Sequence, residues 1–403
     1  MAPLGPFGDR PHLAVGVSGG PHSLALAMLT RDWAAARGGR LTALVVDHGL
    51  RPGSAAEARE AATLLERRHI TSEVLTLRLG VGNAVQRRAR DGRLQVLLQR
   101  CGALGAPWLL LGQHRGDQAE TVLFRAVRGS GAAGLAGVPS CRPAEEALIL
   151  RPLLTVAPAE LEAYLKVNGL VPFRDPSNTD PRFTRVRLRD ALRDADGDGP
   201  GTRALGEAGQ AFATRRSRQE RAVVERLAVA LAWQPGGWAR VDAAALGSDA
   251  TAVLALSGLL RLIGGAVHAP AAGAVRSLLR RGGGTLHGVD WHQGVLCREP
   301  AACAPPVPAV PGAAWDGRWR VEDCPPGCML GALGVFPPLR GRVPARVLAA
   351  SPALWRDGAV LAVPTLGFGA PAVLRPLPPG GPVGRILRAE ARIGGTTWFQ
   401  NGP

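Results

Sequence analysis

A short polar turn between an apolar run and a helix carries the residue types best suited to chemistry in this sequence. Ala14–Val17 is mostly apolar, Ser18-Gly19-Gly20 follows, and Ser23 opens a run of helix-forming residues. Such a turn leaves backbone N–H groups at a helix N-terminus, where they can hold a phosphate or pyrophosphate. Glycine lets the backbone approach a ligand closely, and serine hydroxyls add donors. No Gly-Lys-Ser/Thr follows, so this is not a Walker A loop, and the alternative is an ordinary strand-to-helix connection.

Two further polar segments follow apolar runs that are typical of strands: Asp47-His48-Gly49 after 41–46, and Gln113–Thr121 after 108–112. Asp117 and Glu120 are three residues apart at the expected start of a helix, so both side chains can face one site. Carboxylates there can hold Mg²⁺ or an ammonium group. The alternative is helix capping, because a helix N-terminus favours Asp and Glu whatever the function.

The elements that must position these residues alternate between strands and helices. Expected strands are Leu13–Val17, Leu41–Val46, Glu73–Leu79 and Trp108–Gly112, and expected helices are Ser23–Arg37, Ala55–Arg68, Ala84–Cys101 and Gln118–Val127. This alternation predicts an α/β fold with a parallel sheet covered on both faces. Ligands of such sheets bind at the carboxyl ends of the strands. We therefore expect Ser18, Asp47 and the 113–117 segment to share one cleft.

The motifs and their order resemble a known family. The turn at 18–23 resembles the Ser-Gly-Gly-x-Asp-Ser loop of the PP-loop ATP pyrophosphatases, which split ATP to AMP and pyrophosphate. The remaining motifs are Asp47–Arg51, Gln113–Thr121, Arg128–Gly131, Arg174–Asn178 and Arg185–Arg189. Together they resemble the tRNA(Ile)-lysidine synthetases over residues 12–190, with a weaker similarity at Thr285–Gly288 and Arg298-Glu299. The resemblance implies a doubly wound parallel sheet of the adenine nucleotide alpha hydrolase-like type.

The resemblance also implies a two-step reaction. A ligase of this family uses ATP and Mg²⁺ to adenylate cytidine 34 in the CAU anticodon of tRNA(Ile), releasing pyrophosphate. The amine of free L-lysine then displaces AMP, and the new carbon–nitrogen bond gives lysidine. We therefore expect an ATP-binding, tRNA-modifying enzyme whose partners are tRNA(Ile) and lysine, with a homodimer as one expected assembly.

The family pattern implies roles for particular residues. ATP binding is expected at Ser18, Gly19, Gly20, Pro21, His22, Ser23, Asp47, His48, Gly49 and His114. Catalysis is expected at Asp117, Glu120 and Arg128, with Asp117 as the candidate Mg²⁺ ligand. Binding of tRNA or substrate is expected at Gln86, Arg90, Arg93, Asp175, Ser177, Asn178, Arg185, Arg187 and Arg189.

Several of these assignments have an alternative in ordinary structure. His48 and His114 contact adenine or phosphate, or they are turn histidines satisfied by the backbone. Arg128 meets a phosphate, or it stabilises the C-terminal end of a helix. The arginines of the last group bind RNA, or they form a solvated basic face.

Two residues depart from the family pattern near the expected Mg²⁺–pyrophosphate site. His22 stands where the family has the loop Asp, and Gly116 stands where it has the first Asp of Asp-Asp-Gln. A neutral His does not replace an anionic oxygen ligand for a hard cation, whereas a protonated His can contact phosphate directly. If the site has decayed, restoring both carboxylates should raise activity, provided that residue 116 does not require a positive φ. Leu94 and Val186 also replace usual family residues, an aromatic and an Asn.

Composition narrows the class of protein. The 403 residues, 46% of them hydrophobic, suffice for two or three domains and exclude general disorder. The net charge of +16 attracts polyanions such as nucleic acid, although Lys166 is the only lysine and the Arg surplus is typical of a GC-rich genome. The irregular spacing of Cys297, Cys303, Cys324 and Cys328 disfavours a zinc site. With no signal-peptide pattern and no membrane-spanning run, we expect a cytoplasmic protein without a membrane partner.

The chain is expected to have three parts. Residues 1–195 form the PP-loop catalytic domain, 200–300 a mainly helical tRNA-contacting module, and 301–403 a Pro/Gly-rich region of mixed structure. The acidic run 194–200 is expected to link the first two parts. The second part should open with a long charged helix, Arg203 to about Trp233, and end in a hairpin, Thr285–Glu299. A short strand is expected at Val360–Val363 in the third.

Three functional hypotheses follow. The first is an active enzyme of the resembled family. The second is another PP-loop RNA-modifying enzyme such as a thiolase, although Cys101 and Cys141 do not make the Cys-x-x-Cys pair common there. The third is a tRNA-binding paralogue with impaired catalysis, for which His22 and Gly116 are the argument.

Overall fold

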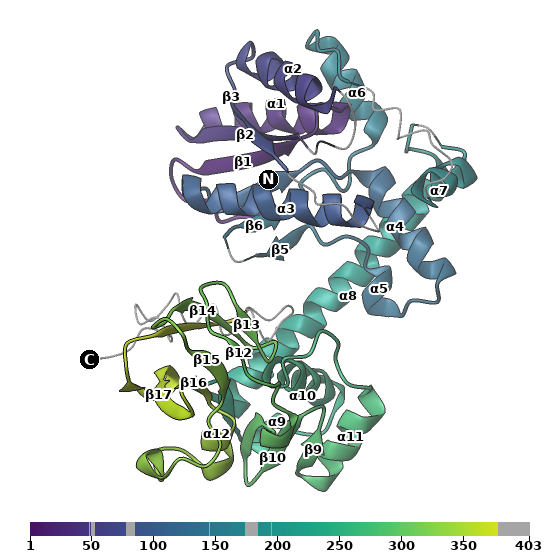
Figure 1. Ribbon diagram of the computed structural model, residues 1–403. Coiled ribbons are helices and arrows are strands. Elements are labelled where there is room, and N and C mark those ends of the chain that lie inside the picture. Colours follow the sequence, from purple (N-terminus) through teal and green to yellow (C-terminus); the bar gives the residue numbers. More distant parts are fainter. Residues whose placement is uncertain are drawn as a thin grey trace. The chain divides into compact units, whose positions relative to one another are not determined.

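The structure is a computed structural model that describes residues 1–47, 49, 53–77, 85–144, 146–173, 184–194 and 196–377 (Figure 1). Two compact units make up the chain, Met1–Arg216 and Ser217–Pro403, and the division falls within the long helix α8, Pro200–Ala230. The residues expected to bind ATP, Mg²⁺ and substrates all belong to the first unit. The finer division into three parts, at 195–200 and at 300, stays a prediction.

The first unit is built on a parallel sheet, as the alternation of strands and helices predicts. Strand β1 pairs in parallel with β2 and β4, β2 with β3, and β4 with β6, while β5 adds an antiparallel edge. The order is β3-β2-β1-β4-β6-β5. The strands are β1 His12–Val17, β2 Arg40–Asp47, β3 Thr71–Thr76, β4 Trp108–Leu111, β5 Cys141–Pro143 and β6 Leu148–Leu150. All four predicted strands are present, although β3 begins and ends earlier than expected.

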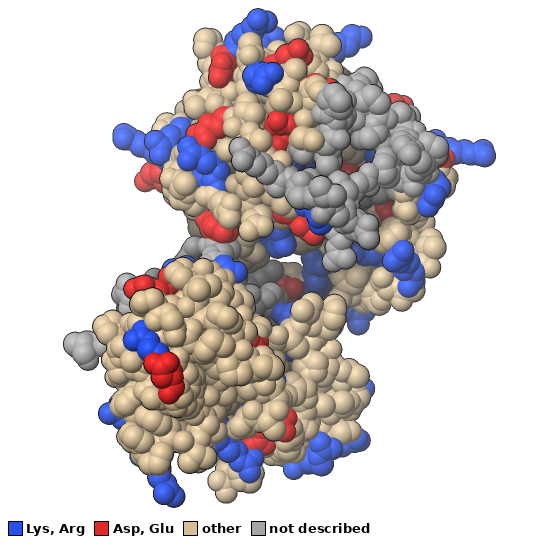
Figure 2. Space-filling view, in the orientation of Figure 1, with Lys and Arg blue, Asp and Glu red and all other residues tan. Residues whose placement is uncertain are grey.

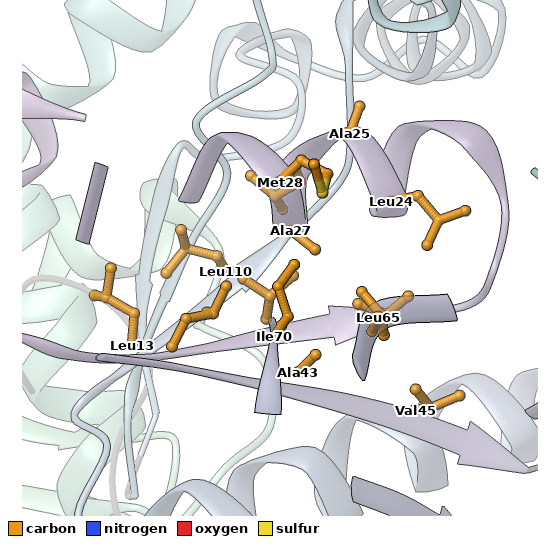
Figure 3. Packing of buried hydrophobic residues seen from close by; sticks show 14 of the residues in the cluster. Leu13, Leu24, Ala25, Ala27, Met28, Ala43, Val45, Leu65, Ile70 and Leu110 are labelled. Atoms are coloured by element: carbon orange, nitrogen blue, oxygen red, sulfur yellow. The ribbon is translucent and has the colours of Figure 1, made fainter. Parts of the chain in front are cut away.

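Helices cover both faces of this sheet, which confirms the doubly wound α/β fold. Successive strand residues point to opposite faces. Leu13 and Val15 therefore pack with α1 and α2, whereas Ala14 and Leu44 pack with α3 on the other side. Figure 3 shows the first of these clusters, in which Met28 of α1 lies over the sheet. The helices are η1 Ala2–Leu4, α1 Pro21–Ala35, α2 Ser54–Glu66, α3 Val85–Leu104, α4 Arg115–Val127, α5 Ala132–Leu135, α6 Pro158–Val167 and α7 Thr184–Leu192.

The second unit contains the C-terminal part of α8 and an antiparallel sheet of order β7-β8-β11-β10-β9. The predicted helix to Trp233 is too long: α8 ends at Ala230, and Leu231–Gln234 is strand β7, paired with β8. The predicted hairpin at 285–299 is confirmed and includes a third strand. The other elements are β8 Trp238–Val241, α9 Ala243–Leu246, α10 Ala250–Ile263, α11 Ala272–Arg281, β9 Gly284–Leu286, β10 Val289–His292 and β11 Val295–Arg298. In this part helices therefore predominate, with an antiparallel sheet beside them, and its expected role as a tRNA-contacting module stays a prediction.

Residues 300–377 add two small antiparallel sheets, of order β12-β15-β16-β17-β18 and β13-β14-β19. Trp315, Trp319 and Leu354 lie in their shared core. The predicted strand at 360–363 is β17. The elements are η3 Pro300–Ala302, β12 Val307–Pro308, β13 Ala314–Trp315, β14 Trp319–Asp323, β15 Met329–Ala332, η4 Pro337–Leu339, α12 Ala345–Ala349, β16 Pro352–Arg356, β17 Ala359–Val363, η5 Pro364–Leu366, β18 Phe368–Gly369 and β19 Val373–Pro376.

A buried charge network includes two residues of the weaker sequence similarity at 285–299, Gly288 and Arg298. Arg298 Nε and Nη2 donate to the two carboxylate oxygens of Asp316 at 3.0 and 2.7 Å, and Nη1 donates to the Gly288 carbonyl at 2.9 Å. Arg318 Nε donates to the same carboxylate at 2.7 Å. Gly288 has φ +70°, and a Cβ there would overlap the Arg298 guanidinium. These motif residues therefore hold the hairpin against the segment after it.

Candidate nucleotide-binding site

The turn from β1 to α1 has the form expected of a phosphate-binding loop. Gly19 has φ +77°, a left-handed conformation that suits glycine, and Gly20 is the N-cap of α1. The Ser18 N–H donates to Ser23 Oγ at 3.1 Å, and Ser23 Oγ donates to the Gly20 carbonyl at 3.0 Å. Pro21 takes the first helical position, and no side chain caps the helix. The first turn of α1 is thus fixed from within and presents a helix N-terminus to an anion.

Close backbone packing holds this loop, and it depends on glycine. Gly112 directly follows β4, and a Cβ on it would stand 3.1 Å from the His22 carbonyl oxygen and 3.1 Å from Ser23 Cα. A Cβ on Gly19 would stand 3.0 Å from Phe173 Cδ2. The Phe173 N–H also donates to the Gly19 carbonyl at 3.0 Å. The expected ATP-binding residues 18–23 therefore lie together, at the carboxyl ends of β1 and β4.

The helix after β4 closes its own N-terminus. His114 is the N-cap of α4: its Nδ1 accepts from the Gly116 N–H at 3.1 Å, and its backbone N–H donates to Asp117 Oδ2 at 3.1 Å. These two contacts form a capping box. His114 is 7% exposed, and burial lowers its pKa, an effect that the Asp117 carboxylate opposes. His114 and Asp117 therefore lie together, and their contacts are those of helix capping, which was the alternative to ligand binding.

Glu120 and Arg189, expected in catalysis and in RNA or substrate binding, form an ion pair. Glu120 is 2% exposed, and its Oε1 lies 2.9 Å from Arg189 Nε and 2.8 Å from Nη2. A buried carboxylate needs such a partner to remain charged. The pair joins α4 to α7. The expected role of Glu120 toward lysine stays a prediction.

Asp47, at the end of β2, organises the turn that follows. Its Oδ1 accepts from the Gly49 N–H at 3.0 Å and from Ser54 Oγ at 2.5 Å. Gly49 has φ +58°, and Ser54 is the first residue of α2. His48 lies outside the described residues. The Asp47 carboxylate therefore shapes the turn at the same edge of the sheet, and its contact with ATP stays a prediction.

Two histidine rings are in contact, one from the first turn of α1 and the other from the N-cap of α4. The rings of His22 and His114 meet edge to face, with centroids 4.0 Å apart and an interplanar angle of 66°. Gly116 stands beside them: a Cβ on it would lie 3.0 Å from His114 Cε1 and 3.2 Å from Nδ1. The two departures from the family pattern, His22 and Gly116, therefore meet at one side chain, that of His114.

Arg128 lies far from this group. It is the C-cap of α4 and stacks over the Phe124 ring at 4.5 Å. At a rise of ~1.5 Å per residue, the helix places its backbone about 16 Å from that of Asp117. The helix alone therefore does not bring the two side chains to one site.

The residues expected to bind RNA are only partly placed. Arg93 and Arg187 are exposed on α3 and α7, and Arg187 Nη2 lies 3.3 Å from Thr184 Oγ1. The structure describes only the helix backbone at Gln86, Arg90 and Arg185. Asp175, Ser177 and Asn178 lie outside the described residues.

Two buried polar side chains that the sequence did not single out support the site. Arg151 is 7% exposed; its Nε donates to Gln113 Oε1 at 2.8 Å and its Nη1 to the Pro139 carbonyl at 2.8 Å. Gln118 accepts from the Val138 N–H at 2.6 Å and donates to its carbonyl at 2.9 Å. The signal for Arg151 was a polar residue directly after the apolar run 148–150. Its hydrogen-bond partners, Gln113 and Pro139, are distant in sequence, so the sequence could not predict them.

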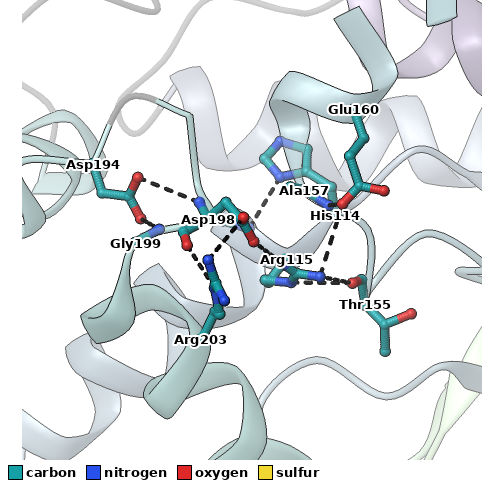
Figure 4. A network of polar contacts seen from close by, with 10 residues as sticks. His114, Arg115, Thr155, Ala157, Glu160, Asp194, Asp198, Gly199 and Arg203 are labelled. Atoms are coloured by element: carbon teal, nitrogen blue, oxygen red, sulfur yellow. Dashed lines mark hydrogen bonds and ion pairs between the residues drawn. The ribbon is translucent and has the colours of Figure 1, made fainter. Parts of the chain in front are cut away.

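The run 194–200 connects α7 to α8, and the side chains of Asp194 and Asp198 make specific contacts (Figure 4). Arg115, the first residue of α4, donates through Nε and Nη2 to the Thr155 carbonyl at 3.0 and 2.6 Å and forms an ion pair with Asp198. Asp198 also accepts from Arg203 of α8 at 3.0 Å. Asp194 accepts from the Gly199 N–H at 2.8 Å. The connection therefore anchors the start of α8 to the start of α4.

The excess positive charge is spread out on the face that Figure 2 shows. Basic side chains of the first unit stand among acidic ones, and much of the visible second unit is neither acidic nor basic. Along α8, Arg215, Arg218 and Arg221 are exposed at a spacing of three. These exposed arginines of one helix are compatible with an RNA-contacting face and equally with a solvated face that includes Glu220 and Glu225.

The carboxylates near the loop fit Mg²⁺ in one limited way. Within the described ranges, no group of three or more His, Cys, Asp or Glu side chains is arranged to hold a metal. The six cysteines are free thiols, and burial raises the pKa of Cys101 to about 12 and that of Cys297 to about 11. Nucleotide-bound Mg²⁺ commonly takes only one or two carboxylates besides phosphate oxygens and water. Asp117, whose Oδ2 accepts from the His114 N–H, stays the predicted carboxylate for such an ion, whereas Glu120 is paired with Arg189.

Among the helices that the structure describes, none is long and apolar enough to cross a membrane.

Comparison with known proteins agrees with this geometry. A family model described as a PP-loop domain matches residues 4–195, which supports ATP use. A tRNA(Ile)-lysidine synthase of Novosphingobium aromaticivorans is 38% identical over 322 residues, 78% of this chain and 89% of the relative. The enzymes of the same name from Bradyrhizobium sp. and Salinispora arenicola are 39% and 44% identical, over 55% and 45% of this chain. The match spans 62% and 55% of the length of these two relatives.

A solved structure of the U34-tRNA thiolase NcsA from Methanococcus maripaludis aligns with a TM-score of 0.45 and 18% identity, over 52% of this chain and 75% of that one. The relatives named above do not favour the alternative of a different PP-loop tRNA-modifying enzyme. One of them is matched along nearly nine-tenths of its length, by a chain that places a glycine turn, a helix N-terminus and Asp117 at one sheet edge. This chain belongs to the tRNA(Ile)-lysidine synthase family.

Proposed function

We propose that this protein forms lysidine in tRNA(Ile). In the first step, O2 of cytidine 34 in the CAU anticodon attacks the α-phosphorus of ATP, and pyrophosphate leaves. In the second, the side-chain amine of free L-lysine attacks C2 of the base, and AMP leaves with the oxygen. The observation that carries this proposal is the uncapped N-terminus of α1 behind Gly19, in a chain of this family.

The residues divide the work as follows. The backbone of the first turn of α1, with Ser18 and Ser23, holds the pyrophosphate part of ATP. The loop around Asp47 and Gly49 borders the nucleotide at the next strand. Asp117 would hold the Mg²⁺ that ATP brings, and this ion offsets the charge of the leaving pyrophosphate. Lysine as the nucleophile, a homodimeric assembly and a cytoplasmic location belong to the same proposal.

The arginines of α3 and α7 are proposed to contact tRNA. Arg93 and Arg187 are exposed there, on α3 and α7. Arg189 contributes differently, because its guanidinium holds Glu120. Through that ion pair it fixes α7 to α4, and so fixes the RNA-contacting helix relative to the nucleotide site.

The test is pyrophosphate release from ATP with and without tRNA(Ile) and lysine. Release should require tRNA with a CAU anticodon, and labelled lysine should enter that tRNA. The matched control is the same tRNA with U in place of C34, which should release no pyrophosphate. Equal pyrophosphate release with C34 and U34 tRNA would contradict the proposal. Adenylated tRNA that does not react with lysine would contradict it as well.

A further inference from the structure

His22, His114 and Gly116 form one structural unit. The His22 ring packs against the His114 ring with centroids 4.0 Å apart. The His114 ring occupies the space beside Gly116, where a Cβ would stand 3.0 Å from its Cε1. The Gly116 N–H in turn donates to His114 Nδ1 at 3.1 Å. A larger residue at 116 would displace the ring that His22 leans on, so the two departures from the family pattern depend on each other.

We propose that His114 is a positioning residue of the nucleotide site, which holds the His22 ring beside the PP-loop and couples the first turn of α1 to that of α4. This inference rests on the proposed function. His22 stands one residue before Ser23, whose hydroxyl shapes the loop. Because His22 belongs to the loop that is proposed to hold the pyrophosphate, His114 acts on ATP through His22.

Two polar contacts and burial fix the His114 ring. Its Nδ1 accepts a hydrogen bond, so the proton of the neutral ring is on Nε2. That Nε2 lies 3.5 Å from Asp117 Oδ2, and the side chain is almost fully buried. The ring cannot turn without losing the cap of α4. The His114 ring therefore has a fixed orientation, and the His22 ring packs against it.

The arrangement changes what the loop offers to ATP. A carboxylate at position 22 would offer oxygen to a metal, whereas an imidazole offers a nitrogen to phosphate. An imidazole on a free rotor would lose conformational entropy when it binds phosphate. Packing against His114 restricts the rotation of the His22 side chain before ATP binds. The smaller loss of conformational entropy should therefore appear as tighter binding of ATP.

The decisive variant is His114→Asn, because it separates the cap from the ring. Asn is a strong N-cap residue, so its Oδ1 can accept from the Gly116 N–H. The melting temperature should stay close to that of the wild type, while KM and Kd for ATP rise about 2- to 10-fold, the range of an aromatic edge contact. His114→Ala removes both contacts, so it should also lower the melting temperature by about 2–4 °C.

A double-mutant cycle tests whether the effect passes through His22. His22→Ala should raise KM and Kd for ATP, and adding His114→Asn should raise them no further. The matched control is His69→Asn, an exposed histidine with φ +57°, a conformation that Asn tolerates. It should leave the melting temperature, KM and Kd unchanged.

The outcomes separate this inference from the proposed function. Additive effects of His22→Ala and His114→Asn, or an unchanged Kd for ATP in His114→Asn, would overturn the positioning role even if the wild type makes lysidine. A wild type that binds ATP but makes no lysidine would overturn the proposed function, and the cycle measured by calorimetry with ATP would still decide the inference.

Discussion

Helices α1 and α4 begin at the ends of adjacent parallel strands, yet their N-termini are built in opposite ways. Strands β1 and β4 pair in register, so both helices start at the same edge of the sheet. α1 starts with Gly20 and Pro21 and no side-chain cap, whereas the side chains of His114 and Asp117 close the start of α4. Both N-termini carry the same partial positive charge. The cap therefore distinguishes the two helix starts, because side chains satisfy N–H groups of α4 and no side chain caps α1.

The comparison shows that carboxylates at a helix start are not by themselves ligands. Asp117 completes a capping box, and Glu120 holds Arg189. The same holds at a third helix start, because Asp194 accepts a hydrogen bond from the Gly199 N–H just before α8. In each case the acidic residue satisfies backbone donors or a nearby cation of the protein.

The largest effect is expected at the ion pair behind the closed helix start. Arg189→Ala leaves the buried Glu120 carboxylate without its guanidinium, which should lower the free energy of unfolding by about 3 kcal/mol. Urea denaturation of the purified protein measures the loss. The matched control is Arg187→Ala on the same helix, expected to change stability by less than ~0.5 kcal/mol because that side chain is exposed. Equal losses in the two variants would show that Glu120 does not depend on Arg189.

The open helix start should be sensitive to Gly19. Gly19→Ala forces a Cβ into a left-handed backbone and to 3.0 Å from Phe173 Cδ2, so the loop or the Phe173 ring must shift. Loss of the donors aimed at the phosphates should lower kcat/KM for ATP about 100-fold. Gly105→Ala is the control, since Gly105 has φ +62° but nothing within 4 Å of its Cβ position. A similar loss of ATP use in Gly105→Ala would assign the effect to general destabilisation.

Restoring the family carboxylates should not improve the enzyme. Gly116 has no positive φ, so the backbone allows Asp, but the new Cβ would press on the His114 ring. We expect Gly116→Asp to lower the free energy of unfolding by about 1–2 kcal/mol, as overpacking does. We also expect His22→Asp with Gly116→Asp to reduce kcat/KM for ATP. A rate above that of the wild type would instead support a decayed metal site.

The smallest effect concerns the third helix start. Burial raises the pKa of Asp194, but hydrogen bonds from Thr202 and from the backbone of Gly199 and its neighbours lower it more, so the net shift is downward. A carboxylate with a lowered folded-state pKa stabilises the fold above its unfolded pKa of about 3.9 and loses this effect as the pH falls. Asp194→Asn should therefore lower the melting temperature at pH 7. The difference from the wild type should shrink below pH ~4, and a constant difference would mean that the charge plays no part.

Much of the first unit could be predicted because its signals are local. The apolar run 41–46 is β2, the glycine turn at 18–20 leads into α1, and the motif order indicated the family. The second unit has weaker local signals. Leu231–Gln234 continues a helical pattern, and its pairing with β8 made it a strand.

The sequence by itself determined the parallel sheet, the position of the loop at Ser18–Ser23 and the family. Only the tertiary structure decided what the site residues contact. Asp and Glu are favoured at a helix start both as caps and as ligands, so residue type cannot distinguish the two roles. Glu120 meets Arg189 across 69 residues of sequence, and His22 meets His114 across the sheet edge. Such contacts depend on how the elements pack in three dimensions, and no local pattern encodes them.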